Sequence, residues 1–267
     1  MNSLVGGVVA AVVAATGVPE PAPAKRDPLV NDRGVKAAQA FAQGREDFVS
    51  FAVIGTKGKV RGYDRARTYP AASVTKAMLM VEVLRRAEGR ALTTAETDLL
   101  YPMITQSANQ PARDLFSLVG SPGLYAVAEA AKMRDFSSAN SLFESQISAE
   151  DQARFFVKLD GLVPRRHRSY ARRLLKSVIP AQRWGIPPAA RERRLTPFIK
   201  GGWRSDVVHQ VALLEKSRRR RVALAVLSET ADQGYGRATI EGVARRVLDP
   251  PGDRRRGDRG RTRRRAQ

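Results

Sequence analysis

Cysteine is absent from the sequence of 267 residues. A disulfide framework, a thiolate nucleophile and a zinc–thiolate site are therefore excluded. Histidine is nearly absent as well: His167 and His209 are the only two, and their spacing does not suit a pair of metal ligands. We therefore expect neither a metal site nor a bound cofactor.

A long hydrophobic run is also missing. The apolar stretch from Leu4 to Val13 is too short to span a bilayer, so we expect no transmembrane anchor. It is followed by Ala22-Pro23-Ala24, which resembles the cleavage site of a secretory signal peptide. No Lys or Arg precedes the run, which keeps a buried N-terminal helix as the alternative. We expect residues 1–24 to be a signal peptide and the protein to be secreted or held in the cell envelope.

Acidic residues are few beside the basic ones: 26 Asp and Glu oppose 47 Lys and Arg, and the net charge is +21. Residues 250–267 hold eight of these arginines, and we expect this low-complexity tail to be disordered. A basic excess can attract nucleic acid, an anionic polymer or a membrane surface, or it can reflect solvated arginines only. Aromatic residues do not alternate with the basic ones as in base-stacking sites, so we expect no specific nucleic-acid binding. Contact with an anionic cell-wall polymer through the basic surface stays open.

The apolar pattern indicates both strands and helices along the chain. Helices are expected at 31–44 and 73–89, over most of 94–180 and at 240–248, a loop at 181–194, and strands at 48–54, 60–66, 197–203, 207–214 and 222–227. This order predicts an α/β (α+β) fold, with a five-stranded antiparallel sheet flanked by N- and C-terminal helices and an all-α subdomain. We expect one domain over residues 25–249, divided into a sheet subdomain (30–70 and 195–249) and a helical subdomain (71–194).

Ser73-Val-Thr-Lys76 stands at the start of a predicted helix and is the only S-x-x-K in the chain. Residues three apart share a helix face, so the hydroxyl of Ser73 and the amine of Lys76 can meet. Serine needs an adjacent base to act as a nucleophile, and a partly desolvated lysine can be that base. We therefore expect this pair to be catalytic. A capping serine followed by a surface lysine is the alternative.

Two S-x-N sequences follow, Ser107-Ala-Asn109 and Ser138-Ala-Asn140. A serine there can relay a proton, and the asparagine amide can hold a lysine and a substrate carbonyl. We favour Ser107 and Asn109, because they lie between apolar helical segments that can fix their position. A turn or a helix N-cap would explain either sequence without catalysis.

The third group, Lys200-Gly-Gly202, lies in a predicted strand and is followed by Trp203 and Arg204. Two glycines let a substrate backbone approach closely, and Lys200 supplies a cation for a carboxylate. A glycine bulge on an edge strand would explain the same residues.

S-x-x-K, S-x-N and K-x-G, in this order and on these elements, resemble the motifs of the penicillin-recognising serine hydrolases, most closely the class A β-lactamases. The stretch Met103-Ile-Thr-Gln-Ser-Ala-Asn-Gln is similar to the M-I-x-x-S-D-N-x signature of that family. The resemblance covers residues 47–248. It implies the β-lactamase/transpeptidase-like fold and an acyl-enzyme mechanism on β-lactams or related D-Ala-type amides and esters.

Carried over to this chain, the resemblance implies that Ser73 is the acylated nucleophile and Lys76 its base or proton relay. Ser107 would pass the proton to the leaving nitrogen, and the backbone N–H groups of Ser73 and Trp203 would form the oxyanion hole. The expected substrate-binding residues are Asn109, Lys200, Gly201, Gly202, Trp203 and Arg204.

The sequence departs from the family pattern at two of its motifs. Gly201 replaces the Thr or Ser of K-[TS]-G, so a hydroxyl beside Lys200 is lost, and Arg204 is the candidate to compensate. Ala108 replaces the usual Asp of the second motif.

The acidic loop that carries the deacylating Glu in class A enzymes has no convincing counterpart. Between residues 134 and 149, Glu144 is the only acid besides Asp135. Glu144 is a candidate substitute base, although a solvated surface acid is the interpretation we favour. Without deacylation the protein would be a slow hydrolase, a transpeptidase- or esterase-like enzyme, or a covalent trap for penicillin.

We therefore expect a secreted, monomeric serine hydrolase with a small-molecule or peptidoglycan-derived substrate. The alternative is a catalytically impaired module of the same fold that binds cell-wall components. Nucleic-acid binding through the tail is the third hypothesis.

Three further residues have simple interpretations. We expect His209 to be a satisfied histidine inside the sheet, and His167 to lie on the surface among its neighbouring arginines. Trp184 either walls the cleft or packs beneath a long loop.

Overall fold

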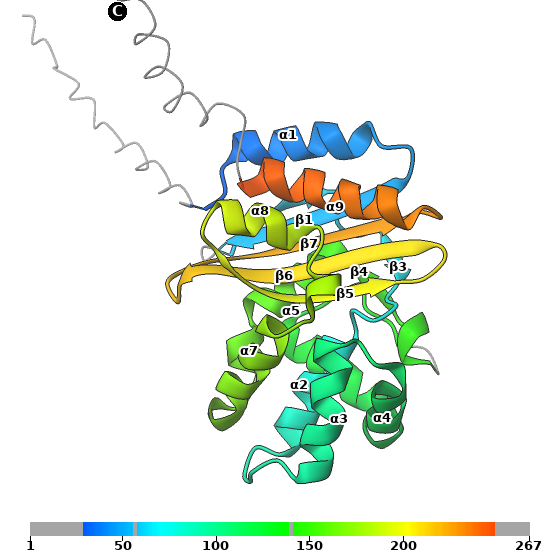
Figure 1. Ribbon diagram of the computed structural model, residues 1–267, viewed down its shortest axis with the longest axis vertical. Helices are drawn as coiled ribbons and strands as arrows, with labels where there is room; N and C mark the ends of the chain where they lie inside the picture. Colours follow the sequence, from blue (N-terminus) through cyan, green and yellow to red (C-terminus); the bar gives the residue numbers. More distant parts are fainter. Residues whose placement is uncertain (1–28, 56–57, 139–140, 249–267) are drawn as a thin grey trace, which may run out of the picture.

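The computed structural model describes residues 29–55, 58–138 and 141–248 (Figure 1). The predicted signal peptide at 1–24 and the basic tail at 250–267 lie outside these residues, as does Asn140 of the second S-x-N sequence. In the part described, helices cover both faces of a central sheet (Figure 1). None of these helices is long and apolar enough to cross a membrane.

Five strands form this sheet: β1 (Phe48–Gly55), β2 (Val60–Tyr63), β5 (Thr196–Trp203), β6 (Val207–Ser217) and β7 (Arg220–Glu229). Their order is β2-β1-β7-β6-β5, and all pairs are antiparallel, as predicted. Strand β5, which carries the Lys200-Gly-Gly202 group, is therefore an edge strand.

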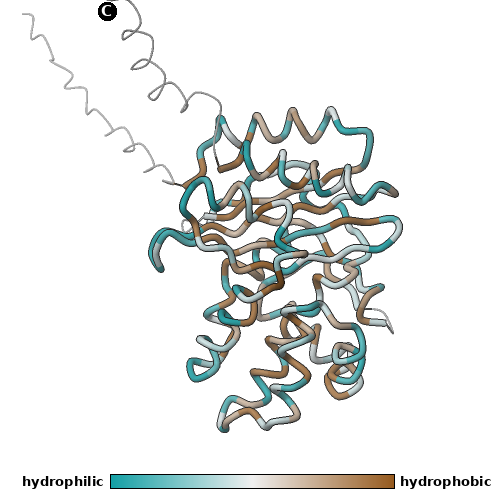
Figure 2. Tube along the Cα trace, in the orientation of Figure 1, coloured by the Kyte–Doolittle hydropathy of each residue, from teal (hydrophilic) through white to brown (hydrophobic). Residues whose placement is uncertain are grey.

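The sheet separates two apolar cores. Residues 222–227 of β7 are all buried, as expected of a central strand, and successive side chains point to opposite faces. Leu224 packs toward α1 (Asp32–Gln43) and α9 (Gln233–Leu248), whereas Ala225 packs toward the other helices. Figure 2 shows the hydrophobic colouring concentrated along the strands and on the helices that cover them.

The predicted first helix is confirmed at both ends. The side chain of Asn31 accepts a hydrogen bond from the N–H of Gly34 at 2.8 Å, and Gly44 follows the last residue of α1. Helices α1 and α9 run side by side on one face of the sheet (Figure 1). Their contact is so close that a Cβ atom on Gly242 would lie 2.4 Å from the ring of Phe41, so a larger residue there would have to displace this ring.

The predicted loop at 181–194 is wrong in part, because it contains helix α8 (Ile186–Glu192). Pro187 lies in its first turn, where a missing N–H breaks no helical hydrogen bond. The N–H of Ile186 donates instead to the side chain of Gln210 on β6, at 2.7 Å. Helix α8 packs against α9, β5 and β6, on the face of the sheet that α1 also covers.

Six helices of the described part lie on the other side of the sheet. Helix α5 packs directly on β1, β6 and β7, and α2 is buried over most of its length. Helix α4 is kinked at Gly120, whose φ is 65°. The helices are α2 (Lys76–Arg86), α3 (Thr94–Thr105), α4 (Asn109–Ala131), α5 (Ala149–Val157), α6 (Leu159–Leu162) and α7 (Arg168–Lys176), with short 3₁₀ turns η1 (Leu142–Glu144), η2 (Arg165–His167) and η3 (Pro180–Gln182).

Two short strands were not predicted from the sequence. β3 (Thr68–Pro70) pairs antiparallel with β4 (Gln146–Ser148), so Pro70 lies opposite Gln146. Each strand has only three residues and therefore no readable alternation. The pair fixes the chain just before Ser73 beside the segment that contains η1.

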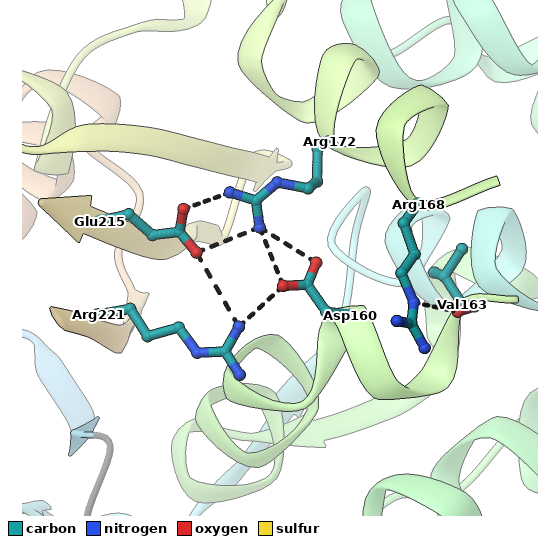
Figure 3. A network of polar contacts seen from close by, with 6 residues as sticks. All are labelled: Asp160, Val163, Arg168, Arg172, Glu215 and Arg221. Carbon is teal, nitrogen blue, oxygen red and sulfur yellow. Dashed lines mark hydrogen bonds and ion pairs between the residues drawn. The ribbon is translucent and has the colours of Figure 1, made fainter. Parts of the chain in front are cut away.

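A network of ion pairs ties the helical side to the sheet (Figure 3). Arg172 on α7 pairs with Asp160 on α6, at 3.1 Å, and with Glu215 on β6. Arg221 on β7 lies 2.8 Å from the same Asp160. In the register of the sheet Glu215 faces the start of β5, so this network is at the opposite end of β5 from Gly202.

Candidate active site

Ser73 lies in a tight turn that leads into α2. The helix itself begins at Lys76, three residues later than the predicted start. The N–H of Ala71 donates to the carbonyl of Ser145 at 2.7 Å, and the N–H of Ala72 donates to that of Phe143 at 3.1 Å. Ala72 has a φ of 47°, in the left-handed region that a residue with a side chain rarely adopts. The turn is therefore strained and held from outside, and it leaves Ser73 partly exposed.

Strand β5 touches this turn through Gly202. A Cβ atom on Gly202 would lie 2.8 Å from the backbone N of Ser73 and 2.9 Å from that of Val74. Both distances are too short for a carbon atom, so this position requires glycine. The contact brings the backbone of Ser73 next to the end of β5, where Trp203 follows.

Lys76 is fully buried at the first position of α2. Its Nζ donates to the carbonyl of Ser107 at 2.5 Å and to Oδ1 of Asn109 at 2.8 Å. Burial, with a smaller contribution from the positive charge of Arg113, lowers the pKa of Lys76 to about 7. The hydrogen bonds within the described chain include none between Lys76 and the hydroxyl of Ser73. Lys76 is thus able to lose its proton near neutral pH.

Lys200 approaches Ser107 from β5. It is fully buried, and its Nζ donates to Oγ of Ser107 at 2.9 Å and to the carbonyl of Gly201 at 2.8 Å. Burial and the nearby charge of Lys76 hold the pKa of Lys200 well below its ordinary value. Among the residues described, neither lysine forms an ion pair with a carboxylate. Two amines without a counter-charge therefore meet at one hydroxyl.

The structure brings the favoured S-x-N sequence to the lysines. Ser107 has a φ of 60° and links α3 to α4, so its hydroxyl and its carbonyl both face amines. Ser138 of the other S-x-N sequence instead bonds the hydroxyl of Ser121 at 2.9 Å, and its N–H donates to Tyr125. The catalytic and binding roles of Ser107 and Asn109 remain predictions.

A side chain has room at Gly201 but not at Gly202. A Cβ atom at Gly201 would lie 3.5 Å from the ring of Trp184 and 3.6 Å from that of Trp203, which are ordinary contacts. The two tryptophan rings meet edge to face with their centroids 6.1 Å apart. Trp184 therefore lies against β5 and also packs on the apolar core, so both expected positions of this ring are met in part, and a hydroxyl-bearing residue would fit at position 201.

Arg204 is held by two carboxylates. Its guanidinium lies 2.6 Å from Asp206 and 2.7 Å from Glu144, and these partners raise the pKa of Arg204 above its ordinary value. Arg204 was expected to compensate for the hydroxyl lost at position 201, but its guanidinium already pairs with Asp206 and Glu144. Glu144, the candidate deacylating base, is exposed and paired with Arg204.

Phe143 belongs to the site although the sequence analysis did not select it. Its ring centroid is 5.3 Å from Nζ of Lys76 and 5.6 Å from the guanidinium carbon of Arg113 on α4. Only the fold reveals this contact, because it depends on η1 lying beside the Ser73 turn. An aromatic ring and a second cation therefore face Lys76 on this side.

The structure confirms the prediction for one histidine and contradicts the prediction for the other. His209 is buried within β6 and fully bonded, as predicted. The expectation that His167 is a surface residue is wrong: it is buried, and its Nε2 bonds the carbonyl of Ala87 at 2.9 Å. Its arginine neighbours in sequence point outward while the ring turns inward. No group of acids and histidines that could hold a metal occurs in the described ranges.

The sheet order, the helical layer and the serine–lysine constellation define the β-lactamase/transpeptidase fold. The sequence from residue 90 to 250 matches the Beta-lactamase enzyme family (Beta-lactamase2), and the chain belongs to that family. The match begins after Lys76, so it covers the second and third motifs but not the first.

Solved structures share this fold at low sequence identity. A β-lactamase from Sphaerobacter thermophilus DSM 20745 has a TM-score of 0.72 and 22% identity, over 82% of this chain and 97% of that one. PBP-A has a TM-score of 0.70 and 15% identity, over 81% and 95%. A mutant of PBP-A, solved as an acyl-enzyme complex with penicillin G, has a TM-score of 0.68 and 14% identity, over 84% and 98%. No curated protein sequence matches the chain.

Proposed function

We propose that the protein is a serine hydrolase that forms an acyl-enzyme at Ser73, with β-lactams or related D-Ala-type amides and esters as substrates. The observation that carries this proposal is the convergence of Lys76 and Lys200 on Ser107, beside the Ser73 turn. A structural lysine pair would be expected to meet carboxylates, because buried amines without counter-charges reduce stability. Amines with a lowered pKa are instead suited to moving protons.

The first step is attack of Ser73 on the substrate carbonyl. Neutral Lys76 accepts the hydroxyl proton while Oγ bonds to the carbonyl carbon. The carbonyl oxygen takes up the negative charge, which the N–H groups of Ser73 and Trp203 stabilise; each such donor is typically worth about 3 kcal/mol of barrier. Gly202 keeps these two segments in contact.

The second step breaks the C–N or C–O bond of the substrate. Ser107 gives its hydroxyl proton to the leaving group and recovers a proton from Lys76, 3.4 Å from its Oγ. Lys200 is bonded to the same hydroxyl, and a substrate carboxylate that bonds Lys200 would favour its protonated form. The products are the acyl-enzyme and a protonated leaving group, so protons and charges balance.

Breaking the acyl-enzyme requires a base for water, and no carboxylate among the described residues pairs with Lys76. We infer that the acyl-enzyme is long-lived, so the protein acts as a slow hydrolase or as a transferase to another nucleophile. The acyl-enzyme of the PBP-A mutant with penicillin G shows that a protein of this fold holds such an adduct.

Intact mass measurement after exposure to a penicillin tests the proposal. Wild type is expected to gain the mass of the intact penicillin at Ser73, and Ser73→Ala is expected to gain none. Following the mass over time gives the lifetime of the adduct. A wild-type protein that neither gains mass nor hydrolyses a chromogenic cephalosporin would refute the proposal for β-lactams.

We also propose that the protein is exported to the cell envelope, as the apolar segment before Ala22-Pro23-Ala24 indicates. Cell fractionation and N-terminal sequencing of the mature protein test this. Recovery of the uncleaved chain from the cytoplasm would contradict it.

A second candidate function is attachment to an anionic wall polymer. The β6–β7 turn and the neighbouring end of α8 expose a set of basic side chains, and Figure 2 shows this turn in hydrophilic colour. The carboxylates Glu192 and Glu215 at this end already pair with Arg245 and Arg172. The exposed cations are Arg191, Arg194, Lys216, Arg218, Arg219 and Arg220.

Sedimentation with a poly(glycerol phosphate) wall polymer tests this second function. Binding should weaken steeply with salt, be unchanged in Ser73→Ala and fall when Arg218, Arg219 and Arg220 are replaced by Ser. Equal binding by the triple variant would contradict the assignment. Tighter binding to single-stranded DNA than to the polymer would favour a nucleic-acid partner instead.

A further inference from the structure

His209 lies beneath the turn that carries Ser73, and the proposed mechanism leaves it unused. Strand β6 places it directly opposite Gly202 in the register, and the side chain is fully buried. Gly202 in turn touches the backbone of Ser73. A buried, titratable ring thus lies one strand away from the nucleophile.

Backbone groups of Pro70, Ser228 and Val208 lie against the ring, and the contacts with Pro70 and Ser228 indicate its tautomer. Nδ1 lies 3.3 Å from the backbone N of Ser228 on β7, and an N–H can only donate, so Nδ1 accepts. Nε2 therefore carries the proton and donates to the carbonyl of Pro70, at 3.0 Å. Burial lowers the pKa of His209 to about 4, which keeps this neutral form at physiological pH.

The carbonyl of Pro70 is a sensitive point of the site, because the strained part of the turn starts directly after it. Ala72 is held at a φ of 47° by surrounding contacts. On one side, the carbonyls of Phe143 and Ser145 bind the N–H groups of the turn. On the side of the sheet, the bond from His209 holds the chain. Edge-to-face contact with Tyr69, at 5.7 Å between centroids, keeps the imidazole in place.

The two expected oxyanion donors lie on different segments: the N–H of Ser73 on the turn and the N–H of Trp203 on β5. Gly202 and Trp203 pair with His209 and Val208 in the register of β5 and β6. The imidazole therefore connects the turn to the same stretch of β6 that positions the second donor.

We propose that His209 is a positioning residue for acylation: its imidazole bridges the N–H of Ser228 and the carbonyl of Pro70 and so fixes the Ser73 turn against β5. This inference rests on the proposed acylation of Ser73. It assigns His209 no contact with substrate and no proton transfer to it.

Three substitutions of His209 distinguish the role of the Nε2–H donor from that of the rest of the ring. His209→Gln keeps a donor near the position of Nε2, His209→Asn keeps an acceptor near that of Nδ1, and His209→Phe keeps only the volume. The second-order rate of acylation by a fluorescent penicillin is expected to fall about 10- to 100-fold in the Phe and Asn variants, since a misplacement of about 1 Å costs up to 100-fold. The Gln variant is expected to recover most of the rate.

His167→Phe is the matched control, because His167 is also buried and also bonds a backbone carbonyl, but at the far end of α2. It is expected to lower the melting temperature while the acylation rate of the folded protein stays at that of wild type. A His209→Phe variant that folds and acylates at the wild-type rate would overturn the proposal. So would an equal loss of rate in the Gln, Asn and Phe variants.

Two measurements that need no substrate test the positioning role of His209 independently of the acylation of Ser73. In ¹⁵N spectra of histidine-labelled protein, His209 is expected to show the Nε2–H tautomer at pH 7. Hydrogen exchange at residues 71–76 is expected to accelerate in His209→Phe and not in His167→Phe. If wild type fails to react with any penicillin but these results hold, the proposed function fails and the positioning role stands. The other tautomer, or unchanged exchange, would overturn the positioning role itself.

Discussion

The ring centroid of Phe143 lies 5.3 Å from Nζ of Lys76. An aromatic face attracts a cation weakly, but it offers neither a proton acceptor nor a formal negative charge. Arg113 approaches the same ring from α4, and among the described residues no carboxylate forms an ion pair with Lys76. In the proposed mechanism Lys76 is the base for Ser73, and the ring of Phe143 supplies no base for the later water.

Phe143→Glu is therefore expected to shorten the life of the penicillin adduct. A carboxylate there would lie near Lys76 and could activate water, and general-base catalysis typically contributes about 100-fold or more. Time-resolved intact mass measures the loss of the adduct. Phe143→Leu is the control, since it removes the ring without adding a base. Equal shortening in both variants would show that access of water, rather than a missing base, limits deacylation.

Gly202→Ala is expected to impair acylation far more than Gly201→Ser. The added carbon at position 202 would lie 2.8 Å from the backbone N of Ser73 and displace the turn, whereas position 201 has room. We expect a drop in acylation rate of about 100-fold or more for Gly202→Ala and a change of less than about threefold for Gly201→Ser. Stopped-flow fluorescence with a reporter penicillin measures both rates. A wild-type rate in Gly202→Ala would contradict the contact.

Acylation should depend on the protonation of Lys76. Because burial lowers its pKa to about 7, the amine is protonated and inactive below that pH and neutral above it. The second-order acylation rate is therefore expected to rise from pH 5 and to level off above about 7. A rate that is flat, or that falls as the pH rises over this range, would exclude Lys76 as the base.

Lys76→Met should abolish acylation and raise stability at neutral pH. A lysine whose pKa is lowered on folding binds its proton more tightly in the unfolded chain, so stability is lost as the pH falls from about 10.5 toward 7. Removing the amine abolishes that loss, and we expect a gain of about 1–3 kcal/mol at pH 7 after the lost hydrogen bonds are counted. Urea unfolding at pH 7 and pH 10 measures it. A gain of the same size at both pH values would point to packing instead.

Arg172→Met should destabilise the protein without affecting the site. Arg172 and Glu215 are largely buried, so its removal leaves carboxylates short of a partner, at a cost of about 2 kcal/mol after allowance for their partial exposure. Arg245→Met, which breaks a more exposed cluster, should cost less than about 1 kcal/mol. Thermal unfolding compares them. Acylation rates that fall in Arg172→Met would show that the network reaches the active site.

The parts of the fold with a strong period were predictable from sequence. Strand β7 is continuously apolar and β5 carries the two glycines near its end, so both strands and the five-stranded antiparallel sheet were predictable, whereas the order of the strands comes from the structure. Ser107 was preferred to Ser138 because the flanking helical segments can fix its position; the structure places it beside both lysines, and its catalytic role stays a prediction.

The missed features depend on contacts between distant residues. Nothing local to Phe143 indicates that its backbone binds Ala72, and β3 and β4 are too short to show alternation. The proline- and arginine-rich composition of 181–194 favours a loop, although proline suits the first turn of a helix such as α8, where Pro187 lies. His167 is buried with its ring bonded to the carbonyl of Ala87, a distant contact that its arginine-rich flanks do not reveal.

The uncompensated amines of Lys76 and Lys200 also make ligand binding a proton-coupled event. Burial lowers the pKa of both amines, and an anionic ligand that enters the site would favour their charged forms, so complex formation is expected to take up protons from solution. Calorimetric titrations in buffers of different ionisation enthalpy would reveal this uptake. The affinity for carboxylate ligands should then weaken as the solution becomes more alkaline, while neutral esters would bind independently of pH. The preference of the empty site for carboxylates over neutral esters is thus expected to be larger at low pH than at high pH.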